Sequence, residues 1–284
     1  MAHPMEGLAE TVMARARDAV ETGGRRFAVS EIFGPTFQGE GPLAGCKTMF
    51  VRFAGCDFRC RMCDSLHSVL PELIAQNSQK LREDEILARL QDLAEGTGTV
   101  WVTLSGGNPA IWDLQGLCAK LRAAGFALAV ETQGSLAPLW LRLCDVVVAS
   151  PKGPGMGENF DADAFEAFCA NLAQAAFPGA PLPKMFLKVV LFSQADVEFA
   201  LHAAAIARKI FPEIESGRCF FSLGNRYLPA PEDDAPALPP DQHVQQLLQD
   251  YRTLWQSLLH DPRIREWRFL PQLHVLAYSN QRGV

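Results

Sequence analysis

Short apolar runs alternate with amphipathic segments along most of the chain. The runs are nearly continuous, as in strands that are covered on both faces, and they occupy residues 47–55, 99–107, 126–134, 145–153, 184–192 and 219–224. The segments between them repeat apolar positions every three or four residues, which predicts helices at 82–96, 113–125, 161–176, 194–210 and 241–259. Such alternation predicts parallel strands joined by crossover helices.

About six strand–helix units fit this pattern, fewer than the eight of a closed (β/α)₈ barrel. The sequence therefore predicts an α/β fold, an incomplete (β/α)₆ barrel. Residues 5–22 have helical periodicity, so we expect a helical N-terminal extension over residues 1–29 and a single barrel domain over residues 30–284. Residues 229–240 are rich in proline and acidic residues and are predicted to form a surface loop.

Composition and charge narrow the class of protein. The chain has 284 residues, 48% hydrophobic and 20% charged, which is ordinary for a globular protein. Its net charge of -6 argues against a broad nucleic-acid-binding face. No run of about 18 apolar residues predicts a membrane span, and the N-terminus lacks the apolar core of a signal peptide. We expect a cytoplasmic protein with reduced thiols.

Three of the eight cysteines, Cys56, Cys60 and Cys63, fall within eight residues. A structural zinc site usually pairs two cysteine knuckles, and with no second knuckle here Cys46 or His67 would have to be the fourth ligand. An iron–sulfur cluster of four irons held by three cysteines instead leaves one iron open. The scattered cysteines are interpreted as small buried hydrophobes: Cys46, Cys118, Cys144, Cys169 and Cys219.

Polar segments follow the first four apolar runs. In barrels of this kind, functional residues lie where strands end and loops begin. The segments are GCDFRC, SGGNP, ETQG and SPK, and we expect them to meet at one mouth of the barrel.

The spacing CxxxCxxC resembles the signature of radical S-adenosylmethionine (SAM) enzymes. SGGNP falls where that superfamily has Gly-Gly-Glu-Pro, with Asn108 in place of the glutamate, and Met62 stands where many members have an aromatic residue. The chain from Ser30 to Val284 resembles the 7-carboxy-7-deazaguanine synthase (QueE) family more specifically. That resemblance rests on EIFGPTFQGEGPLAGCKTMFVRFAGCDFRCRMCDS, SGGNPA, ETQGS, SPK and PQLHVLAYSNQRGV.

The resemblance implies a reaction and its cofactors. The family converts 6-carboxy-5,6,7,8-tetrahydropterin to 7-carboxy-7-deazaguanine with loss of ammonia, in queuosine and related 7-deazapurine biosynthesis. A radical made from SAM takes hydrogen from C6, and the ring contracts. The implied cofactors are a [4Fe–4S] cluster, SAM and Mg²⁺. The implied partners are the small-molecule substrate, an electron donor such as flavodoxin or ferredoxin, and a second copy of the chain in a homodimer. The resemblance also implies that a C-terminal closing segment, PQLHVLAYSNQRGV, covers the barrel.

The resemblance also implies which residues bind the cofactors. Cys56, Cys60 and Cys63 would hold the cluster, and Ser65 would place its hydroxyl on Mg²⁺. The residues expected at SAM are Met62, Cys63, Asp64, Gly107, Asn108, Glu131, Ser150, Pro151 and Lys152. Read without the resemblance, Ser65 is a turn or cap residue and Lys152 a solvated side chain.

The substrate offers N–H donors on its pyrimidinone edge, so carboxylate or amide oxygens should face it. Gln38 and Glu40 are two residues apart and point the same way if the segment is extended; the alternative is a glycine turn with two solvated side chains. Arg52 interrupts an apolar strand and needs an anion, either a neighbouring acid or the substrate carboxylate. The residues expected at the substrate are Phe37, Gln38, Gly39, Glu40, Arg52, Ser105, His274 and Val284.

Two other functions are compatible with the cysteine motif alone. Another radical SAM enzyme, such as one that activates a glycyl-radical protein, would not need QGEG, Arg52 or the closing motif. A non-catalytic zinc- or cluster-binding protein would not need SGGNP and SPK at strand ends.

Overall fold

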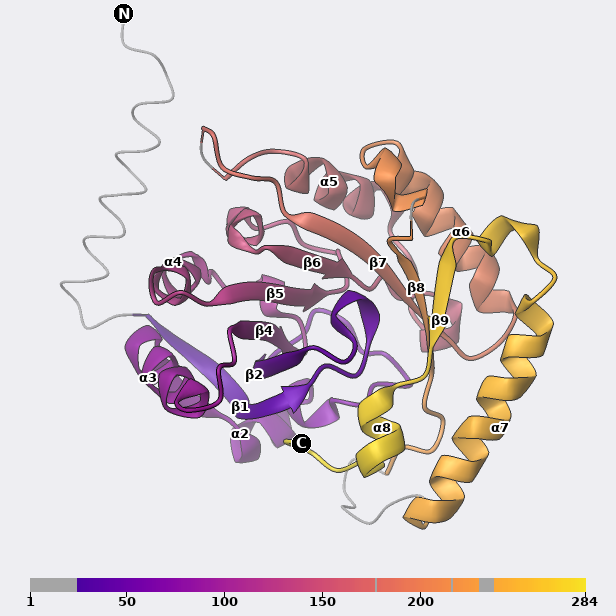
Figure 1. Ribbon diagram of the computed structural model, residues 1–284, viewed down its shortest axis with the longest axis horizontal. Helices are drawn as coiled ribbons and strands as arrows, with labels where there is room; N and C mark the ends of the chain where they lie inside the picture. Colours follow the sequence, from indigo (N-terminus) through magenta and orange to yellow (C-terminus); the bar gives the residue numbers. More distant parts are fainter. Residues whose placement is uncertain (1–24, 177, 216, 230–237) are drawn as a thin grey trace, which may run out of the picture.

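A nine-stranded, open sheet organises the computed structural model, which describes residues 25–176, 178–215, 217–229 and 238–284 (Figure 1). The strand order is β3-β1-β2-β4-β5-β6-β7-β8-β9. The strands are β1 (Arg26–Phe37), β2 (Lys47–Phe53), β3 (Gln79–Arg82), β4 (Trp101–Gly106), β5 (Ala127–Thr132), β6 (Val146–Ala149), β7 (Lys184–Leu191), β8 (Cys219–Leu223) and β9 (Trp267–Leu270).

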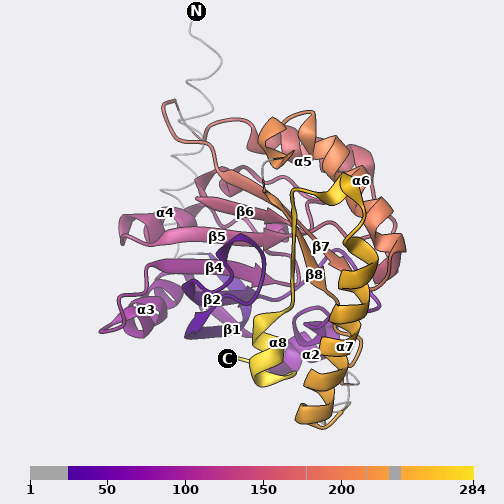
Figure 2. The same cartoon turned by 45° about the vertical axis from the view of Figure 1, so that its right-hand side comes forward.

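Strands β2 and β4 to β9 run parallel, and helical crossovers on the outer face of the curved sheet join them (Figures 1 and 2). The predicted incomplete (β/α)₆ barrel is therefore confirmed. The helices are α2 (Pro71–Asn77), α3 (Glu83–Ala94), α4 (Gln115–Ala123), α5 (Ala162–Leu172), α6 (Ala195–Arg208), α7 (Pro240–Leu258) and α8 (Leu273–Tyr278). Between β5 and β6 the short 3-10 helix η4 (Leu139–Leu143) takes the place of an α-helix.

Local chemistry explains where the helices begin. Three acidic residues fill the first turn of α3, where the helix dipole favours negative charge. One of them, Glu85, accepts a hydrogen bond from the Arg82 backbone N–H at 2.6 Å, so the start of the helix is capped. In α5, Asp161 accepts from the Ala164 N–H at 3.0 Å.

Two antiparallel strands extend the parallel sheet beyond β2. The sequence pattern did not predict β1, which pairs with β2 on one side and β3 on the other. Residues 26–29, assigned above to the N-terminal extension, form the first part of β1. The helix predicted at residues 5–22 lies outside the described residues, as does most of the predicted 229–240 loop.

Each parallel strand divides its side chains between two faces. Side chains such as Val51, Leu104 and Val130 point outward into the main core under the helices. The concave face carries a smaller apolar cluster, Ala129, Val146 and Val148, which packs against Leu43 of η1 (Gly41–Leu43).

Among the described residues, no helix is both long and apolar enough to cross a membrane.

Candidate active site at the carboxyl ends of the strands

One polar side chain stands near the carboxyl end of each of the six parallel strands β2 and β4 to β8, on the concave face. Side chains alternate between the two faces of a strand, and the residues next to each polar residue point into the outer core. The polar side chain therefore points to the concave face. The six residues are Arg52, Ser105, Glu131, Ser150, Lys188 and Ser222. The expected convergence of strand ends on one mouth is thus present, and the sequence analysis missed Lys188 and Ser222.

The three clustered cysteines lie in the loop that follows β2, and all are free thiols. Two of them accept backbone hydrogen bonds: Phe58 N–H donates to Cys56 Sγ and Ser65 N–H to Cys63 Sγ, both at 3.4 Å. Burial raises the pKa of Cys60 and Cys63 to about 12, while the charge of Lys152 acts in the opposite direction on all three thiols. N–H donors and a nearby cation stabilise thiolates, so this donor set fits an iron–sulfur cluster.

The glycines of SGGNP allow two loops to pack against each other. A Cβ on Gly107 would lie 2.3 Å from the Gly55 carbonyl oxygen and 2.9 Å from Cys56 Cβ. The Gly107 N–H donates to Phe53 O at 3.1 Å, and the Asn108 N–H donates to Gly55 O at 2.8 Å. Gly107 therefore supports the cysteine loop directly.

Asn108 is fully buried in a polar network at the same edge. Its side-chain oxygen accepts from the Ala110 N–H at 3.1 Å and from Thr132 Oγ1 at 2.8 Å. Its amide nitrogen donates to Asp57 Oδ1 at 2.8 Å. The Asp57 carboxylate, next to a cluster cysteine, also accepts from Gln133 Nε2 and Ser135 Oγ, both at 2.6 Å. The sequence analysis did not select Asp57, although it lies inside the cysteine motif.

The QGEG segment and the C-terminal motif meet over the concave face. The Leu273 N–H donates to Gly39 O at 3.1 Å, and Gln272 Nε2 donates to Glu40 Oε1 at 2.6 Å. His274 packs directly on Gly39, because a Cβ there would fall 2.1 Å from its Nδ1. Gln38 and Glu40 are buried, so the alternative of a turn with two solvated side chains is wrong.

Glu40 and Glu131 share one buried cation. Lys188 Nζ forms a short ion pair with Glu40 Oε2 and lies 3.2 Å from Glu131 Oε2. Burial by itself favours the neutral acid, but Lys188, His274 and the hydrogen bonds lower the pKa of Glu40 to about 2. Glu131 also accepts from Gln38 Nε2 at 3.0 Å, so residues predicted at SAM and at the substrate are linked.

Arg52 has an acidic neighbour, which is one of the two anions that its place in an apolar strand predicts. Its Nε donates to Glu31 Oε2 at 2.9 Å, and its Nη1 donates to Ser65 Oγ at 2.9 Å. Burial opposes ionisation of Glu31, but His67 and Arg52 lower the pKa of that carboxyl. Within the described chain no hydrogen bond uses Arg52 Nη2, which leaves this nitrogen available to a ligand.

Other predicted site residues lie at the rim or apart from these networks. Lys152 donates to Ser150 Oγ at 3.0 Å, and Pro151 between them is buried. Met62 is half-buried in the cysteine loop, whereas Phe37 is 63% exposed. No hydrogen bond within the described chain joins Val284 to these groups, although the C-terminus lies beside α8 and near β1 (Figures 1 and 2).

Two buried hydroxyls on the concave face, Ser105 Oγ and Ser222 Oγ, have no hydrogen-bond partner among the described residues. A buried hydroxyl without a partner is unfavourable, so these groups favour a polar ligand beside them.

In the described chain, which includes all eight cysteines, no three His, Cys, Asp or Glu side chains are grouped as a site for a metal ion, so the cysteine loop would have to close around zinc or a cluster alike. His67, one possible fourth ligand, instead has its Nε2 3.6 Å from Glu31 Oε2.

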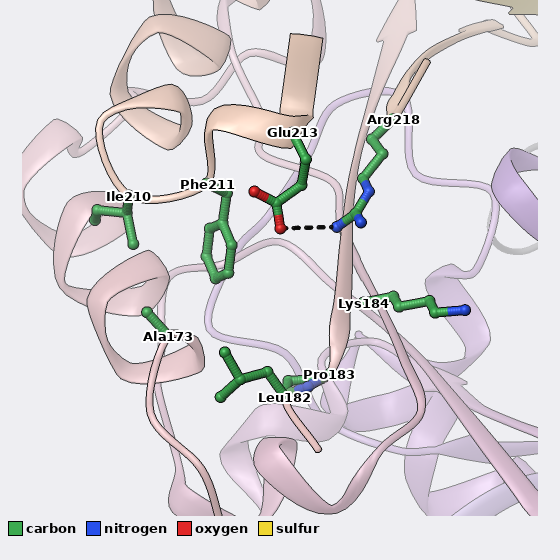
Figure 3. A pocket seen from close by; sticks show the side chains of 8 residues that line it. All are labelled: Ala173, Leu182, Pro183, Lys184, Ile210, Phe211, Glu213 and Arg218. Atoms are coloured by element: carbon green, nitrogen blue, oxygen red, sulfur yellow. Dashed lines mark hydrogen bonds and ion pairs between the residues drawn. The ribbon is translucent and has the colours of Figure 1, made fainter. Parts of the chain in front are cut away.

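A separate pocket of about 340 Å³ lies at the amino ends of β7 and β8, away from these residues (Figure 3). Lys184 and Arg218 line it with apolar neighbours, and Glu213 accepts a hydrogen bond from Arg218 at 3.2 Å. Because function in such barrels lies at the carboxyl ends, we do not assign this pocket to the site.

An incomplete parallel barrel with three free cysteines after its first parallel strand defines a radical SAM enzyme. The fold is similar to the crystal structure of QueE from Escherichia coli, with a TM-score of 0.54, 20% identity, and coverage of 88% of this chain and 95% of that one. No model of a protein family matches the sequence.

Curated relatives identify the particular family. A 7-carboxy-7-deazaguanine synthase from Bacillus cereus is 33% identical over 263 residues, covering 91% of this chain and 99% of the relative. The synthase from Bacillus subtilis is 34% identical over 257 residues, covering 90% and 98%. The chain belongs to the 7-carboxy-7-deazaguanine synthase family, which confirms the resemblance found in its motifs.

Proposed function

We propose that this chain converts 6-carboxy-5,6,7,8-tetrahydropterin to 7-carboxy-7-deazaguanine and releases ammonia, as a carbon–nitrogen lyase of 7-deazapurine biosynthesis. The observation that carries the proposal is the meeting of QGEG with the C-terminal motif over the concave face. There Gln272 holds Glu40 and His274 covers Gly39. A glycyl-radical-activating enzyme would have to admit a protein chain at this mouth, which the closing segment narrows.

The cofactors in this proposal are a [4Fe–4S] cluster on Cys56, Cys60 and Cys63 and a SAM molecule. Bound together, they supply the radical chemistry that starts the reaction. The protein's part is to hold them: Lys152 places a positive charge close to the thiols, where the SAM carboxylate would also be attracted. Met62, Cys63, Asp64, Gly107, Ser150 and Pro151 complete the proposed SAM contacts, and Glu131 would accept from the ribose hydroxyls.

Asn108 has a different role in this proposal from the direct contact with SAM that its motif suggests. Its side-chain oxygen already has two donors, Ala110 N–H and Thr132 Oγ1, so it has no remaining acceptor capacity for an ammonium group. Its amide instead orients the Asp57 carboxylate. We infer that Asp57 supplies the negative charge that the asparagine lacks.

The substrate would be bound by groups that match its chemistry. Glu40 offers carboxylate oxygens to the N–H edge, and Arg52 Nη2 offers a charge-assisted donor to the substrate carboxylate. Gln38, whose side-chain oxygen already accepts from the Gly39 and Glu40 N–H groups, is proposed to shape the loop beside that edge. Ser105 and Ser222 would gain partners for their buried hydroxyls. Gly39 permits His274 to approach, and Phe37 and Val284 are proposed to contact the substrate on closure.

Mg²⁺ is proposed to bind near Ser65. The Ser65 hydroxyl donates to Asp64 Oδ1 at 2.9 Å. A hydroxyl and a carboxylate oxygen, both of the kind that Mg²⁺ prefers, are therefore adjacent. The guanidinium of Arg52 on the same hydroxyl opposes a cation, and a substrate carboxylate that engages Arg52 would relieve this repulsion.

We further propose that the protein is a homodimer of single-domain chains in the cytoplasm, that flavodoxin or ferredoxin donates its electrons, and that it binds neither membrane nor nucleic acid.

The reaction itself is tested with protein that is purified and reconstituted without oxygen. SAM, reductant and the carboxytetrahydropterin are added, and the product is identified by chromatography and mass. Absence of 7-carboxy-7-deazaguanine from protein that holds four irons would refute the proposed reaction.

A further inference from the structure

Lys188 is a buried cation to which none of the sequence motifs assigns a role. It lies on β7, where Val190 is the next residue on the same concave face. Lys188 is only 3% exposed. Both of its ionic partners are carboxylates, Glu40 from the loop after β1 and Glu131 on β5. A lysine this deeply buried requires such partners, and here a single ammonium serves two acids.

The two acids belong to different proposed binding sites. Glu40 faces the substrate edge, whereas Glu131 faces the SAM ribose. Neutral amides complete the network: Gln272 Nε2 donates to Glu40 at 2.6 Å, and Gln38 Nε2 donates to Glu131 at 3.0 Å. Gln38 also accepts from the Glu40 backbone N–H at 3.3 Å, so the side chain that binds Glu131 also fixes the backbone of Glu40.

We propose that Lys188 is a positioning residue that holds Glu40 and Glu131 ionised side by side, so that the substrate and SAM each find a charged acceptor without competing for a proton. This inference rests on the proposed function. The groups facing the pair are Lys188 from β7, His274 from α8, and the amides of Gln38 and Gln272.

Removing the ammonium changes the protonation of the pair. A buried and a half-buried carboxylate at the same place repel each other without a cation, so one of them takes up a proton. With Lys188 present, its charge lowers the pKa of Glu40 to about 2, and the two carboxylates raise the pKa of Lys188 despite its burial. Without it, a ligand that needs one ionised acid drives the proton onto the other acid, and the two ligands then oppose each other's binding.

The test compares Lys188→Met with Lys188→Arg, which keeps the charge, and with Lys184→Met, which removes an exposed lysine from the same strand. SAM and the carboxytetrahydropterin are titrated separately and together by anaerobic calorimetry between pH 6 and pH 9. The native protein and both controls should show one common pH profile for each ligand. In Lys188→Met, either ligand alone can bind with the proton on the other acid, but the second ligand must displace that proton. SAM should therefore weaken pterin binding, and the pterin affinity of SAM-loaded protein should rise about tenfold per pH unit relative to the native profile while the proton is retained.

A Lys188→Met protein with the native pH profile and native affinities would overturn the inference, as would a Lys188→Arg protein that shows the coupled, pH-dependent binding expected of Lys188→Met. If Lys188→Met does not fold, Lys188→Gln is titrated in its place and judged by the same criteria. Iron content of each variant confirms that the cysteine loop is intact. If the native protein does not bind the pterin, the proposed function fails, but thermal unfolding still decides the role of Lys188. The Tm of Lys188→Met should fall relative to the native protein as pH rises from 6 to 9, because only its folded state retains the proton, whereas the Tm difference of Lys188→Arg should stay constant.

Discussion

Gly107→Ala should damage the cluster site without touching a cluster ligand. Gly107 has no left-handed backbone conformation, so the cost of the substitution is steric. The new Cβ would lie 2.3 Å from Gly55 O, whereas ordinary contacts begin at 3.4 Å, which leaves a gap of about 1.1 Å to be opened. Both neighbours are backbone or Cβ atoms of the cysteine loop, so no flexible side chain can move aside.

The size of the effect follows from the contacts that this shift breaks. A displacement of about 1 Å strains the hydrogen bonds from Gly107 N–H to Phe53 O and from Asn108 N–H to Gly55 O. Each contributes roughly 1 kcal/mol, and overpacking adds about 1–3 kcal/mol. We therefore expect the free energy of unfolding to fall by about 3–5 kcal/mol, which lowers Tm by roughly 5–10 °C.

The assay measures thermal unfolding and iron bound per chain after anaerobic reconstitution. Gly116→Ala is the matched control, because its new Cβ would meet only the carboxylate end of Glu83, a flexible side chain. The control should keep native iron content and a Tm that is unchanged or slightly higher, since alanine favours a helix. A Gly107→Ala protein with native Tm and native iron would show that the two loops do not depend on each other as described.

Three further predictions concern single side chains. Cys60→Ala should abolish cluster binding and turnover while circular dichroism and Tm stay near native; global unfolding would instead indicate a structural metal. Asp57→Asn should weaken SAM binding about tenfold or more, the loss expected for a charge-assisted hydrogen bond, with iron content retained; unchanged calorimetric affinity would refute its role. Glu40→Gln should change how the free energy of unfolding depends on pH below pH 4.5. Because the pKa of Glu40 is lowered from 4.5 to about 2, its contribution of roughly 3 kcal/mol is present above pH 4.5 and is lost as pH falls toward 2. The difference in unfolding free energy between the native protein and Glu40→Gln should therefore shrink over that range, and a constant difference would contradict the assignment.

The parallel core of the fold was predictable because its signals are local. Continuous apolar runs and helical periodicity located β2, β4 to β8 and helices α3 to α7, since burial on both faces leaves a pattern in each segment. Strands β1, β3 and β9 and helices α2 and α8 escaped prediction. Strand β1 is an antiparallel strand with partly exposed positions and an internal Gly-Pro, and the others are only four to seven residues long. Their stability comes from neighbours distant in sequence rather than from their own composition.

The sequence by itself determined the class of chemistry, because CxxxCxxC places three thiols in one loop and no distant segment is needed to bring them together. It also marked strand-end polar residues such as Arg52 and Ser105. Only the tertiary structure decided which groups share a charge. Lys188 lies 148 residues from Glu40 and 57 from Glu131, and Asp57 meets Asn108 across 51 residues. Electrostatic and hydrogen-bond energies depend on distances of a few ångströms, which a linear pattern does not encode.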